Sequence, residues 1–132
     1  MRPREIVMYT HLTVGSNDLD RSKKFYDAAL SALGYKYLGM MGEKAHMYGK
    51  DSPQFIVLKP ANGLPATYGN GGTIGFAAPN PSAVSAFHKA GLAAGGKCEG
   101  EPGPRAFAPT AYGAYLRDPD GNKLCAYTFN KA

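Results

Sequence analysis

An internal duplication constrains the fold of this 132-residue chain more than any other feature of its sequence. Residues 10–35 read THLTVGSNDLDRSKKFYDAALSALGY, and residues 72–97 read GTIGFAAPNPSAVSAFHKAGLAAGGK. The copies are offset by 73 − 11 = 62 residues, which aligns Leu12 with Ile74, Phe25 with Phe87, Leu30 with Leu92 and Gly34 with Gly96. Two copies are too few for a solenoid, so the repeat predicts two similar modules that share one core.

The first module reads as a strand, a helix and three further strands. Residues 5–14 are rich in β-branched and aromatic types, as is typical of a strand. Apolar residues at helical spacing predict a helix over residues 19–33, which Gly34 can end by taking a left-handed conformation. Polar and Gly- or Pro-containing breaks then separate three short expected strands, near residues 35–40, 45–49 and 54–59.

The second module repeats this order after a short linker. The Gly-, Pro- and Asn-rich residues 61–71 predict that linker, so we expect one domain over residues 1–132, with module one at 1–60 and module two at 72–132. A strand is predicted over residues 73–78. Asn80 and Pro81 then form a capped helix start, and the helix ends at Gly95 and Gly96.

The C-terminal part is predicted to hold one loop, one tight turn and two strands. Residues 97–98 are expected to begin a short strand, and the Pro- and Gly-rich residues 99–111 are expected to form a loop. The last strands are predicted at residues 112–117 and 123–129. The sequence DPDGN at residues 118–122 is typical of the turn between them.

Composition narrows the classes of partner. The net charge is +5, but the basic residues are scattered and no nucleic-acid motif is present, so we expect no nucleic-acid partner and a preference for a small anion. No apolar run approaches the roughly 20 residues that span a bilayer, and no signal peptide is recognised. Cys98 and Cys125 are the only cysteines and form no CxxC pair. These features predict free thiols in a cytoplasmic protein without membrane contact.

Two segments, HLTVGSNDLDRSKKFYDAALSALGYK and GAYLRDPDGNKLCAY, together with the repeat at residues 72–97, resemble the vicinal oxygen chelate superfamily. This group contains glyoxalase I, extradiol dioxygenases, and bleomycin- and fosfomycin-resistance proteins. The resemblance covers nearly the whole chain and implies an α+β fold, in which two βαβββ modules form an open cup-shaped β-barrel with flanking helices. It also implies that the cup forms either within one chain or across a dimer. Because half-cups have edge strands that favour partners, we expect a homodimer.

Members of this family usually bind a divalent metal through the first and fourth strands of each module, with His or Gln, Glu, His and Glu as ligands. By resemblance the equivalent positions here are His11, Gln54, Thr73 and Cys125, with the register leaving Phe55 as an alternative to Gln54. Thr73 stands where a ligating member has His, and Cys125 stands where DPDGNxxE has Glu. This set has no carboxylate and only two strong ligands, so we expect no metal and no other cofactor.

Other residues are candidates for binding a ligand in the cup. Cys125 could act as a nucleophile if His11 lies close enough to accept its proton, although a buried thiol is usually inert. Arg105 could hold a carboxylate or phosphate in bidentate fashion. Aromatic rings could stack on a planar ligand or pack in the core. The predicted ligand-binding residues are His11, Tyr48, Gln54, Thr73, Arg105, Tyr112, Tyr115 and Cys125.

Three functions remain open at this point. The first is a protein that binds a small organic ligand, with a preference for an anion, in the cup and has a degenerate metal site. The second is an active metal-dependent enzyme with an unusual ligand set, either a lactoylglutathione lyase-like lyase or a dioxygenase. The third is a drug-sequestering resistance protein, although such relatives bind cationic drugs in acidic grooves and this chain is basic. The catalytic residues, if any, are not identified by the sequence.

Overall fold

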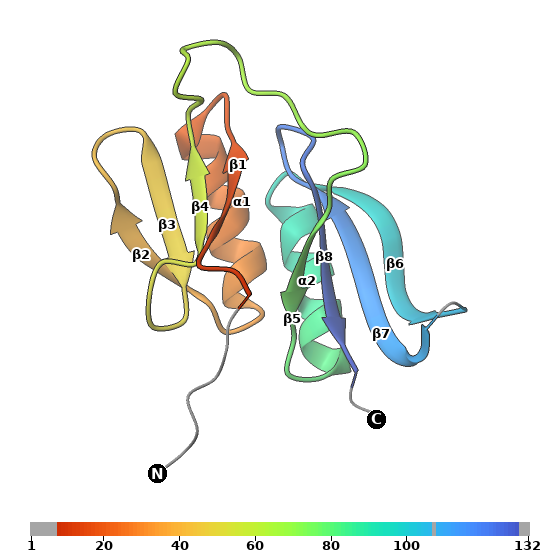
Figure 1. The fold of residues 1–132 in the computed structure, drawn as a ribbon. Coiled ribbons are helices and arrows are strands. Elements are labelled where there is room, and N and C mark those ends of the chain that lie inside the picture. The colour runs from red at the N-terminus through yellow and green to blue at the C-terminus, as the bar shows by residue number, and fades with distance from the viewer. Residues whose placement is uncertain (1–7, 107, 130–132) are drawn as a thin grey trace.

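The computed structural model describes residues 8–106 and 108–129 and contains two copies of a βαβββ unit (Figure 1). The first unit consists of β1 (Leu12–Gly15), α1 (Leu19–Ser31), β2 (Lys36–Met40), β3 (Ala45–Gly49) and β4 (Phe55–Leu58). The second consists of β5 (Ile74–Ala77), α2 (Pro81–Ala93), β6 (Lys97–Arg105), β7 (Ala108–Arg117) and β8 (Lys123–Thr128). The duplicated order predicted from the sequence is confirmed. The N-terminal part of the first predicted strand lies outside the described residues.

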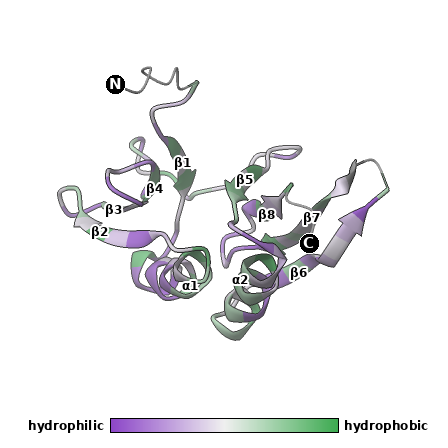
Figure 2. Cartoon of the chain, turned by 90° about the horizontal axis from the view of Figure 1, so that it is seen from below, coloured by the Kyte–Doolittle hydropathy of each residue, from purple (hydrophilic) through white to green (hydrophobic). Residues whose placement is uncertain are grey.

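Each unit forms its own four-stranded sheet. The strand orders are β1-β4-β3-β2 and β5-β8-β7-β6, so each first strand lies beside its fourth strand. That pairing is parallel in both units, whereas the other neighbours are antiparallel. Figure 2 shows both helices on the same side of the two sheets, with β1 and β5 between the outer strands. The sheets do not close, and this arrangement confirms the α+β glyoxalase-like fold and its open cup.

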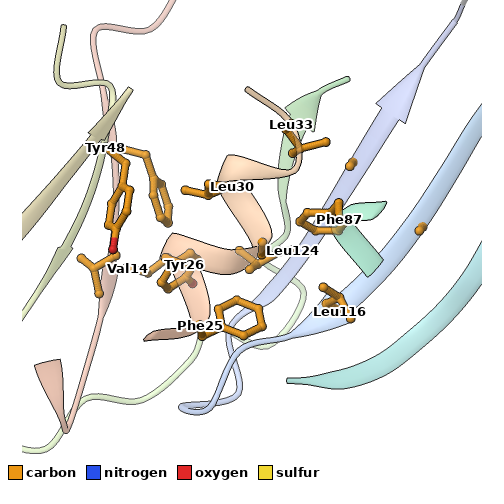
Figure 3. Packing of buried hydrophobic residues seen from close by; sticks show 14 of the residues in the cluster. Val14, Phe25, Tyr26, Leu30, Leu33, Tyr48, Phe87, Leu116 and Leu124 are labelled. Carbon is orange, nitrogen blue, oxygen red and sulfur yellow. The ribbon is translucent and has the colours of Figure 1, made fainter. Parts of the chain in front are cut away.

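The core lies between the helices and the sheets. Phe25 from α1 and Phe87 from α2 are completely buried, together with Leu116 and Leu124 from β7 and β8 (Figure 3). Gly91 lets the helices approach closely, because a Cβ atom there would lie 3.2 Å from the Phe25 ring and would overlap Leu116. Both modules therefore contribute to one hydrophobic cluster, as the repeat predicted.

The turn at residues 118–122 docks onto module one. The Tyr26 hydroxyl, on α1, donates a hydrogen bond of 2.5 Å to the buried carboxylate of Asp118. The Ser22 hydroxyl donates to Asp120 at 3.1 Å. The DPDGN sequence was predicted to form a turn, and it does. Its acidic side chains also hold the two modules together.

The region between α2 and the last strands corrects one prediction. Residues 99–111 were expected to form a loop, but β6 continues to Arg105 and β7 begins at Ala108. β6 lies at the edge of its sheet, where proline is tolerated because one side of the strand needs no hydrogen-bonded partner. Its pairing with β7 shifts register in three places, which accommodates the extra residues as bulges. The prediction of a loop over residues 99–111, which rested on proline and glycine content alone, was therefore wrong.

Candidate ligand-binding site

A cavity of about 600 Å³ lies against the sheet of module two. Side chains alternate along β8, and this alternation decides which of them reach the cavity. Leu124 and Ala126 are buried on the helix side, so Lys123 and Cys125 lie on the opposite face of the sheet. Tyr115 of β7 pairs with Cys125 and shares its face. The residues lining the cavity are Thr73, Glu99, Gly100, Glu101, Arg105, Tyr115 and Lys123.

Two cations lie close to one aromatic ring in this cavity. The guanidinium carbon of Arg105 lies 5.5 Å from the centroid of the Tyr115 ring, and Nζ of Lys123 lies 5.3 Å from it. Neither cation forms an ion pair within the part of the chain that the structure describes. A Cβ atom on Gly100 would lie 3.1 Å from the Arg105 guanidinium and 3.2 Å from the Tyr115 ring. The absence of a side chain at Gly100 therefore permits this close approach.

Backbone carbonyls fix the position of Arg105. Its guanidinium donates hydrogen bonds to the carbonyl oxygens of Glu101 at 2.8 Å and Gly103 at 3.0 Å, and a longer one to Pro104 at 3.3 Å. These acceptors carry no net charge, so the guanidinium keeps its full positive charge while its orientation is restrained. A restrained, unneutralised cation on a cavity wall is suited to binding an anion.

The acidic residues of the cavity have partners of their own. Glu99 forms an ion pair with Arg117, and the hydrogen bond from Arg117 lowers the pKa of Glu99, with further contributions from the charges of Arg117 and Lys123. The Glu101 carboxylate lies 3.7 Å from the Cys98 sulfur. The positive charges of Arg105 and Lys123 are thus not cancelled by direct pairing with these carboxylates.

Cys125 lies beside this cavity as a protonated thiol. Its side chain is only 6% exposed, and burial raises its pKa from the ordinary 9.0 to about 11, although nearby Lys123, Arg105 and Tyr115 oppose the shift. At neutral pH the sulfur therefore is not a thiolate. His11 forms its described hydrogen bond with Thr10 at 2.9 Å rather than with this thiol. The geometry gives no support to a nucleophilic pair of His11 and Cys125.

The structure brings together some of the predicted site residues and separates others. Thr73, Arg105 and Tyr115 line the cavity, and Cys125 adjoins it. His11 and Gln54 are exposed residues of module one and are not among the lining residues. The amide N–H of Leu12 donates to the carbonyl of Gln54 at 2.9 Å, which places His11 and Gln54 at neighbouring positions at the start of β1 and β4.

The register of the first sheet also decides between Gln54 and Phe55. Leu12 pairs with Phe55 in the parallel β1–β4 ladder. Phe55 is buried, and its ring lies 5.1 Å from the ring of Tyr26 in the core. Because side chains alternate along a strand, Gln54 occupies the face that carries His11. Gln54, rather than Phe55, is therefore the residue of this pair that shares a face with His11.

Two of the predicted tyrosines take the second of the two alternatives, packing in the core rather than stacking on a ligand. Tyr48 is almost fully buried, and its hydroxyl donates to Asp27 of α1 at 2.9 Å. The Tyr112 hydroxyl lies 3.3 Å from that of Ser85 on α2. Both side chains thus face the helices rather than the cup. The reason is strand register, since Tyr112 is an odd number of positions from Tyr115 and points to the opposite face.

Lys123, Glu99, Gly100 and Glu101 were missed as cavity residues. Lys123 could have been found, because it lies two positions before Cys125 on a predicted strand and must share its face. Glu99, Gly100 and Glu101 could not be found in this way, because the sequence predicted a loop where β6 lies. The bulges that direct their side chains depend on pairing with β7.

The four positions that hold the metal in family members do not suit a divalent ion here. Gln54 and Thr73 offer neutral oxygens, and the raised pKa of Cys125 keeps its sulfur protonated at neutral pH. His11 is the single remaining strong ligand of the four, and no carboxylate balances the metal's charge. We therefore derive no chemical step through a metal at these positions.

The fold and the sequence together define the class of protein to which this chain belongs. The family model of the Glyoxalase/Bleomycin resistance protein/Dioxygenase superfamily matches residues 9–126, and the chain belongs to this superfamily. Within it, the chain is similar to a glyoxalase/bleomycin resistance protein from Albidiferax ferrireducens T118, with 50% identity and a TM-score of 0.82. That match covers 92% of this chain and 98% of the other. No curated protein matches the chain.

More distant solved structures share the fold alone. A glyoxalase-related enzyme from Fulvimarina pelagi is 17% identical with a TM-score of 0.72, over 92% of this chain and 88% of its own. Lactoylglutathione lyase from Agrobacterium tumefaciens is 19% identical with a TM-score of 0.64, over 95% of this chain and 94% of its own.

Among the described residues, no helix is both long and apolar enough to cross a membrane.

Proposed function

We propose that this protein binds a small organic anion in the cavity of module two, without a divalent metal at the family positions. The observation that carries the proposal is the pair of cations, Arg105 and Lys123, that lie close to the Tyr115 ring. Arg105 would contact a carboxylate or phosphate, while Tyr115 would pack against an apolar or planar part of the same molecule. A cavity of about 600 Å³ is large enough for a ligand of this kind.

Binding rather than turnover is the function that these residues support. Thr73 offers a hydroxyl that can donate to the anion, and the protonated thiol of Cys125 supplies a weakly polar wall beside it. Neither group is an activated nucleophile or a base at neutral pH. The likeness to the lactoylglutathione lyase is a likeness of fold, so we do not extend its reaction to this chain.

The test compares charged probes with uncharged analogues of the same shape. Isothermal titration would measure the affinity of the full chain for benzoate, phthalate and phenyl phosphate, with benzamide as the uncharged analogue of benzoate. We expect at least one anion to bind and benzamide to bind far more weakly. Arg105→Gln should weaken anion binding about tenfold or more, because a hydrogen bond to a charged group contributes about 1.5–3 kcal/mol.

Two further variants make the test specific. Arg105→Lys keeps the charge but loses the planar pair of donors, so it should give an intermediate affinity. Lys24→Gln removes an exposed positive charge on α1 and should leave binding unchanged. The proposal is wrong if none of the anions binds, or if Arg105→Gln binds them as tightly as the unmodified protein does.

A further inference from the structure

Three side chains with metal-binding atoms meet where α2 packs on β6, and one of them, Glu101, also lines the cavity. Nε2 of His88 lies 3.1 Å from the sulfur of Cys98, and that sulfur lies 3.7 Å from a carboxylate oxygen of Glu101. The three ligand atoms all lie within 4.8 Å of one another. Within residues 8–106 and 108–129, this is the one group of three such residues gathered closely enough to share an ion.

The fold assembles this group from two elements. His88 lies on the face of α2 that packs against the sheet, and its side chain is only 5% exposed. Cys98 pairs with Leu116, whose side chain is buried beneath α2, so Cys98 lies on the helix side of β6. The histidine ring is thereby held in place by packing while the thiol remains exposed.

Bulges in β6 bring Glu101 to the same place. In a regular strand, residues three positions apart point to opposite faces, so Cys98 and Glu101 would be separated. The pairing of β6 with β7 shifts register between Cys98 and Gly100 and again between Gly100 and Gly103. These shifts change the alternation and let the carboxylate approach the thiol. An edge strand has the freedom to do this because its outer side is unpaired.

We propose that His88, Cys98 and Glu101 form a zinc-binding site. Imidazole, thiolate and carboxylate are the protein ligands of zinc, and three of them leave a fourth, tetrahedral position for water. Bond lengths of about 2.3 Å to sulfur and about 2.0 Å to nitrogen place those two atoms roughly 3.5 Å apart around a tetrahedral ion. The observed separations of 3.1 and 3.7 Å require only small side-chain movements to reach this geometry.

The ligand set also selects the type of ion. Calcium and magnesium prefer oxygen ligands, whereas a thiolate with an imidazole favours zinc or another thiophilic divalent ion. On binding, the Cys98 thiol loses its proton to solvent, His88 ligates as neutral imidazole, and Glu101 ligates as carboxylate. One proton is therefore released for each zinc ion bound. This site lies on the helix side of the sheet and is separate from the family positions at His11, Gln54, Thr73 and Cys125.

The experiment titrates tag-free, metal-free full-length protein with zinc chloride and, separately, with cobalt chloride. We expect one zinc ion per chain, release of one proton per ion, and a thiolate-to-cobalt charge-transfer band in the cobalt complex. Cys98→Ser should abolish that band, and Glu101→Gln should weaken zinc binding about tenfold or more. The matched control, Cys125→Ala, removes the other thiol and should change none of these results.

A second measurement does not depend on variants that could misfold. One equivalent of zinc should slow the modification of Cys98 by a disulfide reagent at least tenfold, because the metal holds the thiolate. His88→Gln replaces a buried side chain, so the exposed Cys98 and Glu101 variants carry the test. Zinc binding of equal affinity in Cys98→Ser, or no protection of the thiol by zinc, would overturn the proposal. Arg105→Gln should retain zinc binding, which separates this result from the test of the anion cavity.

Discussion

The two cysteines show how strongly position determines the chemistry of one residue type. Cys98 is exposed beside an imidazole, whereas Cys125 is buried between neighbouring strands, where burial raises its pKa to about 11. A disulfide reagent should therefore modify one thiol quickly and the other slowly. The sequence identified Cys125 through its place after DPDGN, but it assigned no role to Cys98. Nothing local to Cys98 predicts that a helix residue ten positions earlier will contact it.

The raised pKa of Cys125 predicts a pH dependence of stability. A group whose pKa is higher in the folded state than in the unfolded state favours folding while it is protonated. That contribution is present below about pH 9 and is lost as the pH rises through about 11. A shift of two units corresponds to about 2.7 kcal/mol at full titration.

Denaturant unfolding of the unmodified protein and of Cys125→Ala, measured between pH 7.5 and 10.5, would test this dependence. The unmodified protein should lose more stability with rising pH than the variant does. The comparison is needed because burial raises the pKa values of Tyr26 and Tyr48, and both lose protons near pH 10 once the chain unfolds, which also lowers stability as the pH rises. Parallel pH profiles for the two proteins would contradict the assignment.

At the scale of secondary structure, the repeat extends to the helix caps. Asp18 accepts a hydrogen bond from the amide of Arg21 at 3.0 Å, and Asn80 accepts one from the amide of Ala83 at 2.8 Å. The two caps are separated by 80 − 18 = 62 residues, which is the offset of the duplication. Each satisfies an amide that the first turn of a helix leaves without an intrahelical partner.

Removing either cap should destabilise the protein by a similar amount. Asp18→Ala and Asn80→Ala should each lower the free energy of unfolding by about 1 kcal/mol, because each leaves one N-terminal amide uncapped. Ser82→Ala changes an exposed residue in the first turn of α2 that is not the cap, and it should have little effect. Chemical denaturation measures all three variants, and a negligible loss in both cap variants would contradict this interpretation.

These elements also show where prediction from sequence succeeds and fails. Both helices and most strands were predicted within a few residues, because caps, glycine stops and apolar periodicity are local signals. β6 was missed because its prolines and glycines indicate a loop unless the strand lies at a sheet edge, and edge position is a property of the whole sheet. For the same reason the cavity was predicted only in part. Thr73, Arg105 and Tyr115 were among the predicted residues, but Lys123 and the other lining residues of β6, Glu99, Gly100 and Glu101, were not.

At the scale of the whole molecule, α1, α2 and the turn at residues 118–122 hold the modules together. The described strands form two separate sheets with no strand pairing between them. Asp118 is buried at this junction and accepts hydrogen bonds from Tyr26 at 2.5 Å and from the side chain of Asn122 at 2.8 Å. Burial raises the pKa of Asp118, and these hydrogen bonds act in the opposite direction. The junction therefore depends on a complete set of polar partners.

Tyr26→Phe should weaken this junction by removing only the hydroxyl. We expect the free energy of unfolding to fall by about 1.5–3 kcal/mol, the usual range for a hydrogen bond to a charged group. Tyr68→Phe removes the hydroxyl from a half-exposed ring and serves as the control, with a change close to zero. Thermal or chemical unfolding measures both. Equal stability of the two variants would show that the hydroxyl of Tyr26 does not hold the modules together.

The docking of this turn also makes the duplicated halves unequal. In module one, β3 and β4 are joined at residues 50–54 by KDSPQ, the counterpart of DPDGN by its place between the third and fourth strands of a module. All five of those residues are exposed, so this connection does not dock onto module two as the turn at residues 118–122 docks onto module one. The contact made by these turns thus runs in one direction only, from module two to module one. A chain built from two copies of module one would have the contacting residues of α1 twice but would lack the turn at residues 118–122. Module one therefore cannot replace module two.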